Sequence, residues 1–321
     1  MLQKPQCPVI ALEEHYGDAE LMAAWDPGER APIPGINERL ADLAELRLRE
    51  MDEAGLDIQV LSHAAPATQK LGVDVAVDLA RRANDRLAAA IAVHPSRFAG
   101  FATLPTANPG AAADELARCV EKLGFKGAML HGIAHGVFLD DRRFWPIYAR
   151  AEALDVPIYL HPSLPHPAVV DAYYKDYAKD YPAITSAAWG FGVETGTLAV
   201  RLILSRIFEQ HPGLKFILGH LGEMLPFFLW RIDFSLNRPG RPPIPFRDLF
   251  CRHFYVTTSG NFSDSTLLCT MMEMGADRIM FSVDYPFVAN KPGVDWLART
   301  PVADEDRAKI ASGNAKKLLK M

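Results

Sequence analysis

The stretch Val9-Ile10-Ala11-Leu12-Glu13-Glu14-His15 joins an apolar run to a polar end, as a buried strand does where it leaves the core. Side chains alternate faces along a strand, so Glu13 and His15 point to one side and Glu14 points to the other. Strand geometry places Glu13 and His15 about 7 Å apart along the backbone. A carboxylate and an imidazole on one face can chelate a divalent cation, so this stretch predicts half of a metal site.

Seven more short, β-rich runs follow and alternate with segments of helical period or composition. The runs span residues 58–63, 98–104, 127–132, 157–161, 215–220, 254–259 and 279–284. Helices are expected between and after them, at 39–54, 73–93, 111–123, 141–154, 195–210, 225–235, 263–275 and 303–320. This eightfold alternation predicts an α/β fold, a closed (β/α)8 TIM barrel with its helices outside. An open doubly wound sheet is the alternative, but no glycine-rich phosphate turn follows the first strand.

Length and composition indicate one globular unit. At 321 residues the chain has a length at which α/β barrels often form one domain, so we expect residues 1–321 to be a single domain. Hydrophobic residues make up 49% of the chain and charged residues 23%, which is typical of a soluble protein with a large core. The formal net charge of −5 gives no argument for nucleic acid or an anionic membrane surface as a partner. No apolar stretch reaches the ~18 residues that span a bilayer.

The cysteines and the N-terminus indicate a cytoplasmic protein. Cys7, Cys119, Cys251 and Cys269 are scattered and form no Cys-x-x-Cys pair. Residues 1–5 lack the long apolar region of an export signal. We therefore expect reduced thiols and a cytoplasmic location.

An unusually long connection follows the fifth predicted strand. Residues 163–194 separate that strand from its helix and contain Tyr173, Tyr174, Tyr177, Tyr181 and Trp189. Such an insertion above the strand ends can form a lid or a wall of a substrate pocket. A contact between subunits explains the same aromatic residues equally well.

In barrels of this kind the chemistry lies at the carboxyl ends of the strands. Reading the ends of the eight runs in order gives Glu13 with His15, His63, His131, His161, His220, Ser259 and Asp284. Five of the ten histidines in the chain stand at these ends, although a single histidine there is more often a core residue.

Four of these residues form the predicted metal site: Glu13, His15, His161 and Asp284. A mixed set of nitrogen and oxygen ligands suits one Zn²⁺ or Mn²⁺ and leaves positions open for water or substrate. Each residue also has a structural explanation. Glu13 could accept backbone hydrogen bonds at the barrel mouth, and Asp284, before Tyr285-Pro286, could cap a turn.

A second pair predicts proton transfer. His220 is followed three residues later by Glu223, at the start of the next helix, where the carboxylate could orient the imidazole. Arg231 lies about two turns farther, among apolar residues, and needs a partner because an unpaired buried charge is costly. That partner is an internal carboxylate or the anionic group of a substrate, bound either in this chain or in a neighbouring subunit; we favour the substrate.

These residues together resemble a known family. The motifs are Ala11-Leu12-Glu13-Glu14-His15, Tyr159-Leu160-His161-Pro162, Ile217-Leu218-Gly219-His220-Leu221-Gly222-Glu223, Thr257-Thr258-Ser259-Gly260-Asn261-Phe262 and Phe281-Ser282-Val283-Asp284-Tyr285-Pro286-Phe287. In order and over nearly the full chain they resemble the amidohydrolase-superfamily non-oxidative decarboxylases. The pattern is most similar to the γ-resorcylate, 2,3-dihydroxybenzoate and 5-carboxyvanillate decarboxylases.

The resemblance implies roles for individual residues. It implies that Glu13, His161 and Asp284 bind the metal and that His15 often joins them. It further implies that Asp284 protonates the aromatic ring, that His220 and Glu223 assist, and that Arg231 approaches the substrate. One departure affects the substrate: Ser163-Leu164-Pro165-His166 follows His161-Pro162, where the γ-resorcylate and 2,3-dihydroxybenzoate enzymes carry Arg-Asn-Pro.

The predicted function is metal-dependent, non-oxidative decarboxylation of an ortho-hydroxybenzoate in aromatic catabolism, with release of CO₂. Protonating the ring carbon first avoids an unstable aryl anion, and a metal orients the substrate. The alternative is a hydrolase of a lactone, amide or ester that uses a metal-activated water; a non-catalytic metal-bound scaffold is a third possibility. We expect substrate contacts from Arg231, His63, Tyr16 and Trp189, and a homodimer or homotetramer.

Overall fold

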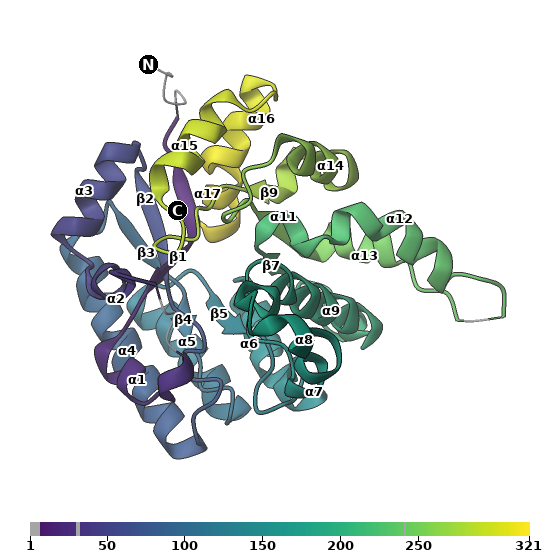
Figure 1. The fold of residues 1–321 in the computed structure, drawn as a ribbon, viewed down its shortest axis with the longest axis horizontal. Helices are drawn as coiled ribbons and strands as arrows, with labels where there is room; N and C mark the ends of the chain where they lie inside the picture. Colours follow the sequence, from purple (N-terminus) through teal and green to yellow (C-terminus); the bar gives the residue numbers. More distant parts are fainter. Residues whose placement is uncertain (1–6, 30–32, 241) are drawn as a thin grey trace.

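The computed structural model describes residues 7–29, 33–240 and 242–321 and contains parallel strands surrounded by helices (Figure 1). Residues 1–5, on which the absence of an export signal was argued, lie outside this range. The strands pair in the order β1-β2-β3 and β4-β5-β6-β7-β8-β9, each parallel to its neighbour. They are β1 (Ile10–Tyr16), β2 (Ile58–His63), β3 (Phe98–Gly100), β4 (Ala102–Thr103), β5 (Ala128–His131), β6 (Ile158–His161), β7 (Phe216–Leu218), β8 (Phe254–Thr257) and β9 (Ile279–Met280).

The nine strands correspond to the eight predicted ones. β3 and β4 are the two halves of the predicted strand 98–104 and are separated only by Phe101. The ring closes where the segment 282–285, beyond β9, meets β1: Asp284 N donates to Glu13 O (3.1 Å), and His15 N donates to Tyr285 O (2.6 Å). We call this junction, between residues 13–15 and 282–285, the closing seam. The predicted (β/α)8 barrel is confirmed.

Helices follow the strands in turn and cover the outside of the barrel (Figure 1). Several predicted boundaries differ. The predicted helix 39–54 is divided into α2 and α3. The predicted helix 195–210 begins at Gly190 and is divided into α9 and α10, and the predicted helix 303–320 is divided into α16 and α17 by a π-helical turn at Lys309–Gly313. The main helices are α1 (Ala19–Ala23), α2 (Ile36–Ala41), α3 (Glu45–Ala54), α4 (Val73–Val93), α5 (Pro109–Leu123), α6 (Trp145–Ala153), α9 (Gly190–Leu204), α10 (Ile207–Gln210), α11 (His220–Glu223), α12 (Leu225–Leu236), α13 (Phe246–His253), α14 (Asp264–Met274), α15 (Asn290–Arg299), α16 (Asp304–Ala308) and α17 (Asn314–Leu319).

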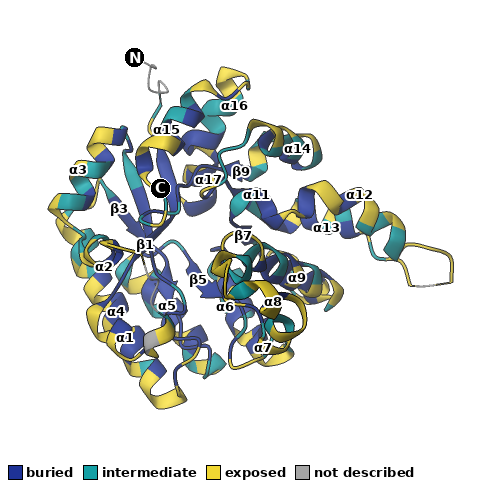
Figure 2. Ribbon diagram, viewed as in Figure 1, coloured by how far each residue is buried: buried dark blue, intermediate teal, exposed yellow. Residues whose placement is uncertain are grey.

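Apolar side chains form two layers of core, and Figure 2 shows the buried strands at the centre of the ring. The larger layer lies between the strands and the helices. The inner layer combines strand residues such as Leu12, Phe101 and Ile217 with Leu318 and Leu319 of α17. The barrel interior is therefore packed, so a reaction site is confined to the mouth where the strands end.

The long connection after β6 contains short helical turns: α7 (Pro167–Val169), η3 (Val170–Tyr174), α8 (Lys175–Ala178) and η4 (Pro182–Thr185). Tyr173, Tyr177 and Tyr181 are exposed on it. Among the described helices, none combines the length and the apolar character needed to cross a bilayer. The assignment of residues 1–321 to a single domain stays a prediction.

Candidate metal centre

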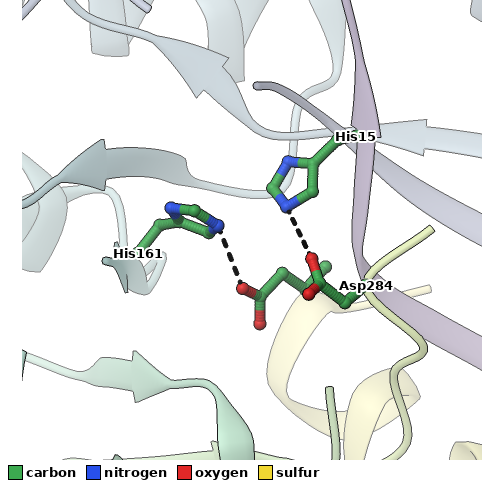
Figure 3. Close-up of side chains that lie close together, drawn as sticks. His15, His161 and Asp284 are labelled. Carbon is green, nitrogen blue, oxygen red and sulfur yellow. Dashed lines mark ion pairs between the residues drawn. The ribbon is translucent and has the colours of Figure 1, made fainter. Parts of the chain in front are cut away.

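The structure brings the four predicted ligands together at the barrel mouth. Glu13 and His15 come from β1, His161 ends β6, and Asp284 follows β9. One ligand atom from each lies within 4.8 Å of the others. Figure 3 shows His15 and Asp284 pointing toward one another, with the His161 ring directed into the same space. Ligands from three segments distant in sequence thus meet at one point.

The protonation of His161 indicates that a cation fits between its Nε2 atom and the carboxylate of Glu13. Its Nδ1 lies 2.7 Å from the carbonyl oxygen of Pro162, which can only accept, so Nδ1 carries the hydrogen. The Nε2 lone pair then faces Glu13 Oε1 at 3.3 Å. Burial and, to a smaller extent, the nearby His15 lower the pKa of His161 to about 3, so the ring is neutral at neutral pH. A cation between the lone pair and the carboxylate oxygen would satisfy both atoms.

Two further atoms support a cation at this position. Glu13 Oε1 and His15 Nε2 are buried and make no hydrogen bond. His15 Nε2 lies 3.2 Å from Asp284 Oδ1. Buried polar atoms are almost always satisfied, and a single divalent ion would satisfy these atoms together. The donor set of two imidazoles and two carboxylates therefore fits a metal of the Zn²⁺ or Mn²⁺ type.

Glu13 is held by Tyr159, which the sequence analysis missed, and by Ser259, which it placed at a strand end without a role. Its Oε2 accepts hydrogen bonds from the hydroxyl groups of Tyr159 and Ser259, which leaves Oε1 for a cation. Tyr159 also contacts Thr257 Oγ1 at 2.7 Å. Tyr159 lies two residues before His161 and therefore on the same face of β6, so strand alternation could have indicated it.

The local path of β1 departs from a regular strand. Its pairing with β2 shifts register between Ala11 and Glu14, so β1 carries one extra residue at a bulge that includes Glu13. A bulge bends the strand and redirects a side chain, which alternation alone does not describe. Glu14 leaves the barrel interior as predicted, but its carboxylate is fully buried and accepts hydrogen bonds from the segment after β9. Burial raises the pKa of Glu14 to about 8 against the effect of those hydrogen bonds.

His220 and Glu223 form the predicted pair. His220 Nδ1 lies 2.7 Å from Glu223 Oε1, and His220 Nε2 lies 3.9 Å from Asp284 Oδ2. Burial lowers the pKa of His220, but the carboxylates of Glu223 and Glu13 outweigh burial and raise it well above its usual value. Burial also opposes ionisation of Asp284, yet the contacts with His15 and His220 hold its pKa below the usual range. A charged imidazole therefore stands beside a carboxylate.

The backbone around this pair is strained. His220, Leu221 and Glu223 have φ values of 50°, 58° and 52°, and Asp284 has a φ of 74°. Non-glycine residues rarely adopt this left-handed region, and such strain concentrates at functional sites. The turn from His220 to Glu223 is what directs both side chains toward each other.

The four residues predicted to contact the substrate differ in burial and in their position relative to the cleft. His63 has both ring nitrogens committed to backbone groups, with Nε2 accepting from Asp18 N and Nδ1 donating to Ala64 O, each at 2.9 Å. Tyr16 is buried with its ring edge against His63. Trp189 lies half-exposed at the rim of a cleft, whereas Arg231 is exposed on α12 and does not line that cleft.

A cleft of about 1070 Å³ opens beside the metal ligands. Asp284 and His220 reach its wall, while Glu13 and His15 are buried beneath it. Its remaining lining is largely apolar and aromatic and includes Trp189, Phe191, Phe227 and Phe262. An aromatic lining with a few polar groups at one end is typical of a site for a small planar ligand.

The fold and these side chains define a TIM-barrel protein with one metal site at the carboxyl ends of its strands. The chain belongs to the amidohydrolase family, whose model matches residues 21–321. It is 42% identical to the γ-resorcylate decarboxylase of Polaromonas sp., over 97% of this chain and 98% of the relative.

Solved structures show the same likeness. The dihydroxybenzoic acid decarboxylase of Polaromonas sp. JS666, with bound manganese and the inhibitor 2-nitroresorcinol, has a TM-score of 0.89 and 41% identity, covering 98% of this chain and 97% of that one. The 5-carboxyvanillate decarboxylase of Sphingomonas paucimobilis has a TM-score of 0.91 and 32% identity, covering 98% and 100%. The predicted resemblance to metal-dependent amidohydrolase-superfamily decarboxylases is confirmed.

Removing the metal tests the site. We expect a chelator to lower the stability of the protein and Mn²⁺ to restore it, by about 2.7 kcal/mol at a concentration 100 times its dissociation constant. The restoring effect should be lost in His161→Ala, which removes a ligand, and kept in His94→Ala, which alters a histidine just before β3, at the opposite end of the barrel. Denaturation with and without Mn²⁺ measures this stabilisation. An equal gain in stability from Mn²⁺ in both variants would contradict the proposed location of the metal site.

Proposed function

We propose that this chain catalyses the metal-dependent, non-oxidative decarboxylation of an ortho-hydroxybenzoate, with Glu13, His15, His161 and Asp284 as metal ligands. The observation that carries the proposal is the position of His220, held by Glu223 and 3.9 Å from Asp284, at the wall of an aromatic cleft. Whole-length relatives that are named decarboxylases support the reaction class. They do not favour the hydrolase alternative.

Residues of this chain account for the movement of the proton. Asp284 reaches the cleft but is ionised at rest, so it would first take a proton from His220 Nε2 across their 3.9 Å separation, while Glu223 holds His220 through Nδ1. Asp284 would then deliver that proton to the ring carbon that bears the carboxylate. The bond to the carboxylate then breaks, its electron pair returns to the ring, and CO₂ leaves. The apolar lining would exclude water from the ring.

The bound metal would supply positive charge that orients the substrate's carboxylate and adjacent hydroxyl group. Of the two ions predicted, we propose Mn²⁺, because two similar solved structures contain bound manganese. Zn²⁺ fits the same mixed ligand set, so comparing both ions in apoprotein of known metal content decides between them.

The substrate assay tests the function. We expect the Mn²⁺-loaded protein to release CO₂ from 2,6-dihydroxybenzoate and form resorcinol, because two relatives that are 42% and 40% identical are named for that acid. Salicylate and 5-carboxyvanillate test how far the Ser163–His166 departure changes the choice of acid. The matched control is 2,6-dimethoxybenzoate, which lacks the ortho hydroxyl group. Ring opening of a lactone panel without CO₂ from any hydroxybenzoate would reverse the assignment.

Asp284→Asn separates metal binding from proton delivery. The amide oxygen can still coordinate the metal, but the side chain has no acidic proton at neutral pH. We therefore expect metal content to stay and turnover to fall by several orders of magnitude, an effect of the size seen when a group acts only in the transition state. Metal analysis and steady-state kinetics measure the two quantities. Turnover close to normal in a metal-loaded variant would remove Asp284 from this role.

We also propose that the protein is a homo-oligomer that uses the outer face of α12. Phe227 (78% exposed), Trp230 (66%) and Phe234 (52%) lie on this helix, and the Trp230 and Phe234 rings stack at 5.2 Å. Figures 1 and 2 show α12 and α13 projecting from the barrel with exposed residues along α12. Contiguous exposed aromatic side chains on a soluble protein usually mark an interface, and Arg231 lies within this face.

Light scattering tests the oligomer. Trp230→Glu should reduce the molar mass to that of one chain, because a charge would have to be desolvated at the interface. Val93→Glu, which changes an exposed apolar residue at the end of α4, is the control and should keep the oligomer. A monomeric unsubstituted protein would refute the proposal.

The predicted cytoplasmic location is supported by four free cysteines, and cell fractionation tests it.

A further inference from the structure

Two fully buried ionisable residues, Glu14 and Arg47, lie outside the reaction described above. Both have 0% exposed surface. Burying a charge is expensive unless hydrogen bonds and an opposite charge compensate it, so such residues have a specific structural or functional reason. Both residues contact the closing seam.

Glu14 connects β1 to the chain on either side of Asp284. Its Oε1 accepts from Ser282 Oγ at 3.0 Å and from Val283 N at 2.8 Å, and its Oε2 accepts from Tyr285 N at 3.1 Å. The residues before and after Asp284 are thus fixed to the residue between the two β1 ligands. Asp284 itself has a φ of 74°, a conformation that a non-glycine residue keeps only when its surroundings impose it.

Arg47 holds the other part of the seam from α3. Its Nη2 donates to the carbonyl oxygen of His15 at 2.6 Å, and its Nη1 donates to Gln59 Oε1 on β2 at 3.0 Å. Its guanidinium group lies 4.7 Å from the centre of the Tyr285 ring. Arg47 therefore fixes the backbone of one ligand and packs against the residue that follows another. Burial lowers the pKa of Arg47 to about 10, against the effects of Tyr285 and Glu14.

We propose that Glu14 and Arg47 are positioning residues that set the separation of His15 and Asp284 by fixing the backbone on both sides of the closing seam. The inference rests on the proposed metal site. His15 and Asp284 come from two different segments, so the distance between them depends on how rigidly the junction between those segments is held. The hydrogen bonds of Glu14 and Arg47 are added to the two backbone bonds of the seam and restrain residues 15, 283 and 285 directly.

Glu14→Gln tests the proposal because an amide has one acceptor oxygen, so in either orientation it loses the hydrogen bond from Val283 N or the one from Tyr285 N. We expect the Mn²⁺ dissociation constant to rise about 10- to 100-fold, the usual effect of removing a residue that orients a metal ligand. Calorimetric titration of apoprotein with Mn²⁺ measures this without any substrate. At saturating Mn²⁺ we expect kcat to fall more than KM rises.

Glu115→Gln is the matched control. Glu115 is also a buried carboxylate, but it binds Asn84 and Arg118 on the outside of the barrel and contacts no ligand segment. This control should lose stability and keep its Mn²⁺ affinity. If Glu14→Gln does not fold, Arg47→Lys replaces it with the same expected weakening, since one ammonium group cannot reproduce the guanidinium contacts.

The outcomes separate the two proposals. Normal Mn²⁺ affinity in a folded Glu14→Gln or Arg47→Lys variant would overturn the positioning role, even if the variant were less stable. An unsubstituted protein that binds Mn²⁺ but decarboxylates no hydroxybenzoate would overturn the proposed function and leave the Mn²⁺ comparison between variants valid.

Discussion

Closure of the barrel between its first and last strands is the constraint on which the site depends. Two backbone hydrogen bonds, Asp284 N to Glu13 O and His15 N to Tyr285 O, join the segments that carry three of the four predicted ligands. A β-bulge in β1 and a left-handed residue at Asp284 accompany this closure. The metal site is therefore a property of the junction more than of either strand, and irregular backbone is concentrated there.

Charge is distributed unevenly among the residues at the mouth. Burial lowers the pKa of His161 and so leaves its ring free to act as a metal ligand, whereas neighbouring carboxylates raise the pKa of His220. Two histidines in one site thus have opposite protonation because Glu223 contacts only one of them at hydrogen-bond distance. This difference is consistent with the proposed roles, metal binding for His161 and proton transfer for His220.

Features that depend on local periodicity can be predicted from the sequence. Features that depend on contacts formed when the barrel closes cannot. Strand–helix alternation predicts the barrel, and strand ends predict the four ligands and the His220–Glu223 pair, because each is a local pattern repeated on one scaffold. The support that Tyr159 and Ser259 give to Glu13 joins strands far apart in sequence. The buried role of Glu14 depends on the last strand meeting the first. The exposure of Arg231 depends on how far α12 projects, which a pattern of apolar residues does not specify.

The wide separation of the ligands in the sequence has a consequence for folding. Residues 13, 161 and 284 span most of the chain, so a nascent or truncated chain that lacks the last strand has no complete site. Contacts of such long range form late, after the loop-closure entropy of the intervening chain has been overcome. A metal ion would therefore recognise the finished barrel and not its precursors. Metal binding would then shift the folding equilibrium toward molecules with a closed barrel. Only chains that are fully synthesised and closed would carry the metal.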